Sequence, residues 1–171
     1  MRSRRQQMTA QPRVTNAVAL VACGTRAVID AVFGPRKPGE PVLGRRLLRS
    51  MHQGMVVLLD RGFATNAFLQ AAAGTGADFP ARLSAVRKPP VLHRFDDGSF
   101  LSQIGTGQVR IIECEITIVT TAGRHSGVYR LATTLLDHRR YLAFELVRLY
   151  HERWGATRCR TSLSELSEGG R

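Results

Sequence analysis

The chain has 171 residues, 43% of them hydrophobic, and a formal net charge of +12. This length predicts one domain with its own core, and the charge favours polyanionic partners, with nucleic acids, ribosomes and anionic membranes all left open. The longest apolar run, residues 17–23, is far too short to cross a membrane, which excludes a membrane-spanning chain.

Hydrophobic periodicity and turn residues predict a mixed α/β fold. The first half is expected to form two strands, a helix, a strand buried on both faces and a second helix, at residues 14–23, 26–33, 41–50, 56–59 and 64–73. The second half is expected to form a short strand, two β-hairpins and a last helix, at residues 81–86, 91–104, 110–136 and 139–154. The core therefore spans residues 14–154. Residues 1–13 are expected to be a disordered basic flank, and residues 155–171 a disordered tail.

The three cysteines lack the spacing of metal ligands and indicate a reducing compartment, so we expect a cytoplasmic protein. Cys23 and Cys114 lie in predicted strands and are expected to be small core residues. The five histidines are scattered without a pair at i, i+4, so no zinc site is predicted.

Asp60 is the first candidate site residue. The apolar run 56–59 leads directly into Asp60, Arg61, Gly62 and Phe63. A carboxylate at the end of a buried strand would lie on a rigid element, at the rim where open α/β sheets bind ligands. Such a carboxylate can hold a divalent metal ion. The alternative is that Asp60 caps the N-terminus of the helix that follows.

The last predicted helix holds the second candidate pair, Tyr150 and Arg153. These residues are three positions apart and share one face of the helix. An aromatic ring beside a guanidinium suits a phosphate backbone, because arginine binds phosphate oxygens in a bidentate manner. The alternative is an ordinary Tyr–Arg pair on a surface helix.

Together, the two motifs and their spacing resemble the DDE transposases of the insertion-sequence-4 family. Residues 23–31 resemble the strand pair that precedes the family's second catalytic aspartate, and residues 47–50 resemble the helix that follows that pair. Residues 133–137 resemble the strand before the family's last catalytic helix. The resemblance covers residues 14–155 and depends on the order of these segments more than on any one of them.

The resemblance implies a ribonuclease-H-like mixed sheet with flanking helices and a β-hairpin insertion. It also implies DNA as substrate, and two aspartates and a glutamate that hold a pair of divalent ions, usually Mg²⁺. Two such ions, about 4 Å apart, stabilise the attacking and leaving oxygens of an in-line phosphoryl displacement. Asp60 corresponds to the second catalytic aspartate and would be a metal ligand. Tyr150 and Arg153 would position DNA or support the site.

The match to the family's catalytic residues is incomplete. No acidic residue precedes Asp30, so the family's first aspartate has no counterpart here. In the family, a glutamate lies four residues after the arginine and a lysine follows it, but these positions are Thr157 and Ser164 here. Glu152 is adjacent to Arg153 and therefore lies on a different face of the helix.

These departures predict a truncated transposase core that is inactive and whose metal site is not functional. One alternative is a basic nucleic-acid-binding module without chemistry. Another is an active enzyme that uses Asp30 and Glu152 in place of the missing ligands. Distances among the carboxylates distinguish these interpretations.

Overall fold

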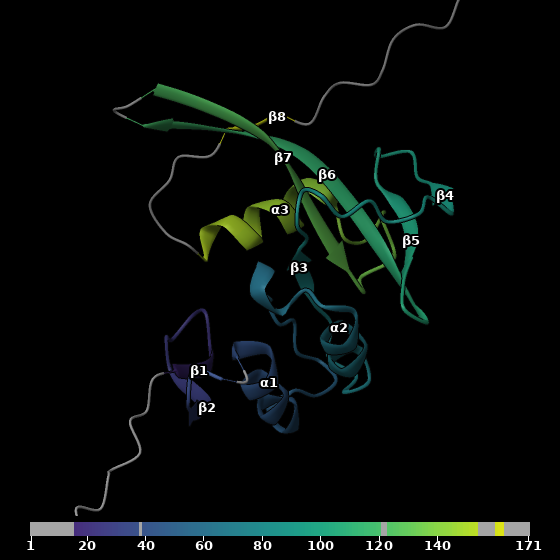
Figure 1. Cartoon of the computed structure of the whole chain (residues 1–171). Coiled ribbons are helices and arrows are strands. Elements are labelled where there is room, and N and C mark those ends of the chain that lie inside the picture. The colour runs from purple at the N-terminus through teal and green to yellow at the C-terminus, as the bar shows by residue number, and fades with distance from the viewer. Residues whose placement is uncertain (1–15, 38, 121–122, 154–159, 163–171) are drawn as a thin grey trace, which may run out of the picture.

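The computed structural model describes residues 16–37, 39–120, 123–153 and 160–162. The predicted flank at 1–13 lies outside these residues. The described chain begins with a hairpin of β1 (Asn16–Val21) and β2 (Val28–Gly34), paired antiparallel (Figure 1). This hairpin corresponds to the two predicted strands. Because β1 ends at Val21, Cys23 lies exposed in the connecting loop, so its prediction as a core residue is wrong; Cys114 is buried as predicted.

The two predicted helices of the first half are present in shorter form. The first divides into α1 (Glu40–Gly44) and the 3-10 helix η1 (Arg45–Ser50). The second divides into the 3-10 turn η2 (Arg61–Phe63) and α2 (Asn66–Ala73). The hydroxyl of Thr65 accepts a hydrogen bond of 3.2 Å from the Phe68 N–H and caps α2. The helix proper therefore starts after Thr65.

The apolar run at 56–59 is not a strand buried on both faces. It makes two isolated parallel bridges, Val56 with Asp78 and Leu59 with Ala81. Val56 is 47% exposed, whereas Val57 is 8% and Leu59 is 5% exposed. The predicted interior position is wrong because, among the described residues, this segment has a neighbour along one edge only. A run of apolar residues does not reveal which of its edges is paired.

The main sheet has the strand order β3-β7-β6-β5-β4, with antiparallel pairing throughout. Its strands are β3 (Pro80–Arg82), β4 (His93–Arg94), β5 (Phe100–Ile104), β6 (Gly107–Thr120) and β7 (Gly123–Thr133). The two predicted hairpins are confirmed, and Gly98 takes a φ of 80° in the first turn. The segment 56–59 lies beside β3 and gives the sheet a parallel edge.

Part of the predicted tail is a strand. Residues Arg160–Ser162 form β8, which pairs antiparallel with β6 at Glu115–Thr117. The three residues carry no pattern that distinguishes them from the rest of the tail. They form a strand through their backbone pairing with β6, which their own sequence does not reveal. The other residues of 155–171 lie outside the described part of the chain.

Alternate side chains of β6 point into two different cores. Val109 and Ile111 belong to a cluster that includes residues of α1, η1 and α2. Ile112 and Cys114 belong to a second cluster beneath α3 (Ala143–Glu152). In Figure 1, α3 runs alongside the β6–β7 hairpin. The predicted mixed α/β class is confirmed, and no helix in the described residues has the length and apolar character needed to span a bilayer.

Candidate functional site

Asp60 lies at the carboxyl end of the segment 56–59, as predicted. Its backbone is extended, and its side chain accepts a hydrogen bond of 2.7 Å from the Arg61 N–H. Asp60 is therefore the N-cap of η2, a turn of three residues, and it remains partly exposed. The alternative of a helix cap applies only to this turn, since Thr65 caps α2.

Tyr150 of α3 fixes the backbone immediately before Asp60. The Tyr150 hydroxyl donates a hydrogen bond of 2.9 Å to the Leu59 carbonyl oxygen, and the side chain is fully buried. Burial raises the pKa of Tyr150 well above its usual value, and the nearby Tyr129 and Asp60 raise it further. Tyr150 is thus a neutral donor in the core, and the predicted aromatic contact with DNA has no exposed Tyr150 surface in this structure.

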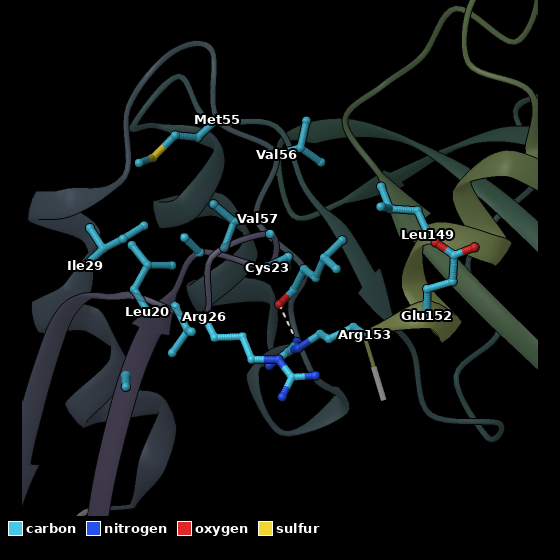
Figure 2. Close-up of a pocket in the computed structure, with 15 residues that line it drawn as sticks. Leu20, Cys23, Arg26, Ile29, Met55, Val56, Val57, Leu149, Glu152 and Arg153 are labelled. Carbon is cyan, nitrogen blue, oxygen red and sulfur yellow. Dashed lines mark hydrogen bonds between the residues drawn. The ribbon is translucent and has the colours of Figure 1, made fainter. Parts of the chain in front are cut away.

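Arg153 holds the same segment one residue earlier. Its Nη1 donates a hydrogen bond of 2.7 Å to the Leu58 carbonyl oxygen, while the residue itself is exposed (Figure 2). The structure therefore brings together the three predicted site residues, although Tyr150 and Leu59 are 91 positions apart in the chain. The shared helix face of Tyr150 and Arg153 points at the strand that carries Asp60.

A group of residues beside Asp60 was not predicted. The Arg82 guanidinium lies 4.3 Å from the centre of the Tyr129 ring. The backbone N–H of Arg82 donates a hydrogen bond of 3.3 Å to the Leu59 carbonyl oxygen. The ring centres of Tyr129 and His151 are 5.0 Å apart. No spacing in the sequence signals this group, because Arg82 and Tyr129 come together through the pairing of β3 with β7.

His151 is the member of this group with a buried polar atom that makes no hydrogen bond within the described residues. Burial lowers its pKa, and the positive charge of Arg82 lowers it further. Its Nε2 atom is buried without a hydrogen-bond partner among the described residues. A neutral imidazole is the form that tolerates such a position, because burying an unpaired cation costs far more than burying an unpaired neutral nitrogen.

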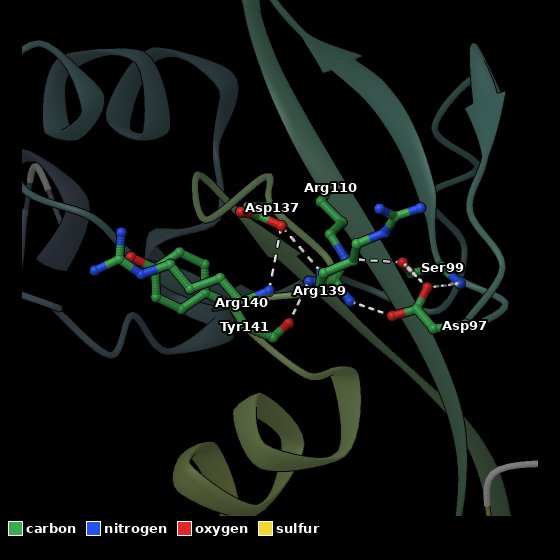
Figure 3. Close-up of polar contacts among 7 residues, drawn as sticks. All are labelled: Asp97, Ser99, Arg110, Asp137, Arg139, Arg140 and Tyr141. Atoms are coloured by element: carbon green, nitrogen blue, oxygen red, sulfur yellow. Dashed lines mark hydrogen bonds and ion pairs between the residues drawn. The ribbon is translucent and has the colours of Figure 1, made fainter.

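The start of α3 is anchored by a buried arginine. Arg110 is fully buried; its Nη1 donates 2.6 Å to the Tyr141 carbonyl oxygen and its Nε 2.8 Å to the Ser99 hydroxyl (Figure 3). Its Nη2 forms an ion pair with Asp97. Since Tyr141 lies next to Leu142, the N-cap of α3, this network fixes the start of α3 on the sheet. It thereby determines where Tyr150 and Arg153 reach the segment 56–59.

The turn after Asp60 is also closely packed. A Cβ placed on Gly44 would lie 2.6 Å from Cε1 of Phe63 and 3.2 Å from Cε2 of Phe68. The two phenylalanine rings are themselves 5.2 Å apart. Gly44 therefore lets α1 approach Phe63 closely. The Asp60 turn is thus packed against α1 on one side and bonded through Leu58 and Leu59 to Arg153 and Tyr150 on the other.

The other candidate carboxylates are engaged elsewhere. Arg49 donates two hydrogen bonds of 2.9 Å to Asp30, and Ser50 donates one of 2.7 Å. The Arg49 hydrogen bonds, with that of Ser50, lower the pKa of Asp30 to about 2. Glu152 pairs with Arg148 at 3.3 Å on the exposed side of α3. The structure thus gives each carboxylate a basic partner of its own.

A divalent metal ion is the cofactor that the resemblance implies. Such an ion needs several oxygen ligands, and a two-ion site needs at least one shared carboxylate with others around it. In the residues that the structure describes, no three His, Cys, Asp or Glu side chains form a group that could hold a metal ion. The described residues therefore do not fit the two-ion site, and the role of Asp60 as a metal ligand stays a prediction.

Comparison with known families places most of the chain in one family model. A family model described as the transposase DDE domain matches residues 5–156, which is well over half of the chain. A search of curated proteins gives no match. The match spans both the turn at Asp60 and the helix with Tyr150 and Arg153. The chain belongs to the transposase DDE domain family.

Proposed function

We propose that this chain is a partial transposase core of the insertion-sequence-4 type that binds DNA without cutting or joining it. The observation that carries the proposal is the pair of hydrogen bonds from Tyr150 and Arg153 to Leu59 and Leu58. These bonds join the two motifs of the family at one point and leave Asp60 partly exposed beside them. A ribonuclease-H-like arrangement of the strands is part of the same proposal, supported by the parallel bridges beside β3.

In this proposal the chain's own residues support the end of the segment 56–59 and position the Asp60 carboxylate. Tyr150 and Arg153 hold the strand end, and the N–H of Arg61 fixes one carboxylate oxygen of Asp60. Divalent ions, usually Mg²⁺ in the family, would supply charge stabilisation of the phosphoryl displacement when bound. Because Asp30 and Glu152 are each paired with an arginine, Asp60 lacks, among the described residues, the carboxylate partners that such ions need.

DNA binding follows from charge. The chain has 25 lysine and arginine residues against 13 aspartate and glutamate residues. Cations placed against phosphates release condensed counterions, which favours binding to any sequence and makes affinity fall as salt rises. Exposed arginines lie around the candidate site, Arg61 and Arg153 among them. We expect DNA to approach this face.

A strand-cleavage assay with Mg²⁺ and with Mn²⁺ tests the catalytic half of the proposal. We expect the purified chain to release no product from duplex DNA above the level of Asp60→Ala. Cleavage by the chain that Asp60→Ala abolishes would overturn it and would show that other carboxylates complete the site.

A salt titration of DNA binding tests the other half. We expect the logarithm of the association constant to fall linearly with the logarithm of the salt concentration, equally for unrelated sequences. Tight binding that is insensitive to salt and confined to one sequence would contradict the proposal.

A further inference from the structure

Three aromatic rings, those of His93, Phe95 and His138, form a cluster at the β4 edge of the main sheet. The rings of Phe95 and His138 are stacked, with their centres 4.6 Å apart and an angle of 20° between their planes. The His93 ring meets the Phe95 ring edge-on, at 5.3 Å between centres. His93 is exposed, and Phe95 and His138 are partly exposed. This ring cluster is therefore accessible to a ligand.

The ring cluster and the candidate site lie at opposite edges of the sheet. His93 belongs to β4, which is the last strand in the order β3-β7-β6-β5-β4. The segment 56–59, which leads into Asp60, lies beside β3 at the other end of that order (Figure 1). A ligand on the ring cluster would therefore occupy a surface separate from the Asp60 turn.

A buried arginine joins the two segments that carry the rings. Phe95 begins the turn between β4 and β5, and its N–H donates a hydrogen bond of 2.9 Å to the Ser99 carbonyl oxygen. Arg110 donates to the Ser99 hydroxyl in this turn and to the Tyr141 carbonyl oxygen in the segment after His138 (Figure 3). Because one fully buried side chain holds both segments, the stack of Phe95 on His138 is formed before any ligand binds.

Exposed arginines surround the ring cluster. Arg94 lies between His93 and Phe95 in the chain, and Arg139 and Arg140 directly follow His138. The three arginines are exposed, and none of them forms an ion pair with a described residue. Their guanidinium groups are therefore available to an anion from outside the chain.

The carboxylates in these segments offset the positive charge only in part. Asp97 forms an ion pair with Arg110, and Asp137 accepts hydrogen bonds from the backbone N–H groups that follow it. Residues 93–97, 110 and 137–140 together carry four arginines and three aspartates. The surface around the rings keeps an excess of positive charge.

Aromatic rings between exposed arginines suit an unpaired nucleobase with its phosphates. Every base has a π-face that stacks on an aromatic ring, and arginine binds phosphate oxygens. In a duplex the neighbouring bases cover these faces, so the ring cluster has no stacking partner there. An acidic peptide would satisfy the arginines but would leave the rings without a stacking partner.

We propose that the ring cluster of His93, Phe95 and His138 stacks on unpaired bases of single-stranded DNA, while the exposed arginines beside it bind the flanking phosphates. The inference rests on the proposed DNA-binding function and adds to it a second surface that prefers single strands. Base identity has little effect on this binding, because stacking uses the face of the base and not its hydrogen-bonding edge.

Fluorescence anisotropy with matched probes tests the stacking. The probes are a thymidine strand of about 12 nucleotides, an abasic strand of the same length and a duplex of the same length. The abasic strand has the same phosphates but no bases, so we expect the chain to bind the thymidine strand about tenfold more tightly. Equal affinity of the chain for these two strands would overturn the proposal.

Substitution of Phe95 identifies the surface. Phe95→Ala should abolish the preference for thymidine over the abasic strand and leave the affinities for abasic strand and duplex unchanged, whereas Phe95→Trp should keep the preference. Phe33→Ala is the matched control, since Phe33 is 62% exposed on β2 and lies outside the ring cluster. Far-ultraviolet circular dichroism verifies the folding of each variant. An equal loss in Phe33→Ala would overturn the assignment to Phe95.

A fluorescent base reports the stacking directly. 2-Aminopurine at the centre of the thymidine strand should lose fluorescence on binding, because stacking on an aromatic ring quenches it. His138→Ala is a second variant that removes the partner of Phe95, and the quenching should be lost in both His138→Ala and Phe95→Ala. Quenching that persists in both variants would contradict the proposal.

The failure of this inference differs from the failure of the proposed function. Salt-sensitive binding of the duplex without any preference for thymidine over the abasic strand would overturn the ring cluster alone. A thymidine preference that Phe95→Ala abolishes, without binding of the duplex, would support the ring cluster and overturn the proposed duplex binding. A uridine strand that binds at least tenfold more tightly than the thymidine strand would assign the surface to RNA and overturn the inference.

Discussion

The Tyr150 hydroxyl donates its hydrogen bond to the carbonyl oxygen of Leu59, the last residue before Asp60. The donor is fully buried and Leu59 is 5% exposed, so water is not available to replace the bond. Loss of a buried hydrogen bond costs about 0.5–1.5 kcal/mol, and the other donor to this oxygen, the Arg82 backbone N–H, lies farther away at 3.3 Å. The position of the Asp60 turn therefore depends on a side chain that is fully buried in the core.

Tyr150→Phe should lower the free energy of unfolding by about 1 kcal/mol, since it removes the shorter of the two hydrogen bonds to the Leu59 carbonyl oxygen and leaves only the bond of 3.3 Å from the Arg82 backbone N–H. Urea denaturation monitored by fluorescence measures the change. Tyr141→Phe is the matched control, because the Tyr141 hydroxyl makes no hydrogen bond in the described part of the structure. A loss of stability as large in Tyr141→Phe would refute the role given to Tyr150.

Arg153→Ala should weaken DNA binding alike for all sequences, because a phosphate contact carries no information about the bases. Its side chain is exposed and reaches Leu58 on the strand that ends at Asp60. Fluorescence anisotropy with two unrelated duplexes measures the loss, and the salt slope should decrease by about 1. Arg148→Ala, on the same helix, is the control for general charge loss; sequence-dependent loss at Arg153 would point to base contacts.

Asp97→Ala should destabilise the fold by about 3 kcal/mol or more, because it leaves the guanidinium of Arg110 buried without its counter-ion. Burial already lowers the pKa of Arg110, against the opposing influence of Asp97. Thermal unfolding measures the effect. Asp96→Ala is the neighbouring control, since Asp96 is exposed and forms no ion pair within the described residues. Equal shifts for the two variants would contradict the anchoring role of the Arg110 network.

The ion pair between Asp30 and Arg49 predicts a pH dependence of stability. The folded pKa of Asp30 is lowered from 3.8 to about 2, so the folded state favours the carboxylate. The resulting stabilisation is complete above the unfolded pKa and is lost as the pH falls from about 4 towards about 2. Asp30→Asn should therefore be less stable than the parent chain at pH 6 and similar to it near pH 2. Urea titrations at both values test this, and an undiminished difference near pH 2 would contradict it.

The sequence predicts which segments form hairpins and helices better than it predicts how these segments pair and pack in the fold. Glycine and aspartate at the turn that contains Gly98 were sufficient to predict the first hairpin of the sheet, and the amphipathic pattern was sufficient to predict the helix of Tyr150. The burial of residues 56–59 could not be predicted, because a continuous apolar run does not show whether one or both faces of the segment are covered. Val56, whose side chain lies on the face opposite to that of Val57, is 47% exposed, whereas Val57 is 8% exposed.

The candidate site likewise contains residues that local motifs predict and residues that only the tertiary structure brings together. Asp60, Tyr150 and Arg153 are predicted site residues because each lies in a short motif of the sequence, and the structure places them close together. Arg82 and Tyr129 could not be predicted, because they meet only when β3 pairs with β7 and they carry no local pattern. The role of Tyr150 as a buried donor likewise depends on a contact across 91 positions, which local spacing does not show.

The close approach of Gly44 to Phe63 has a consequence for how this family can vary. A methyl group at position 44 would overlap the ring of Phe63, which follows Asp60 by three residues. The two positions are therefore expected to mutate in concert, with any larger residue at 44 accompanied by a smaller one at 63. Across an alignment, their covariation would record the geometry of the Asp60 turn even where the carboxylate itself has been lost.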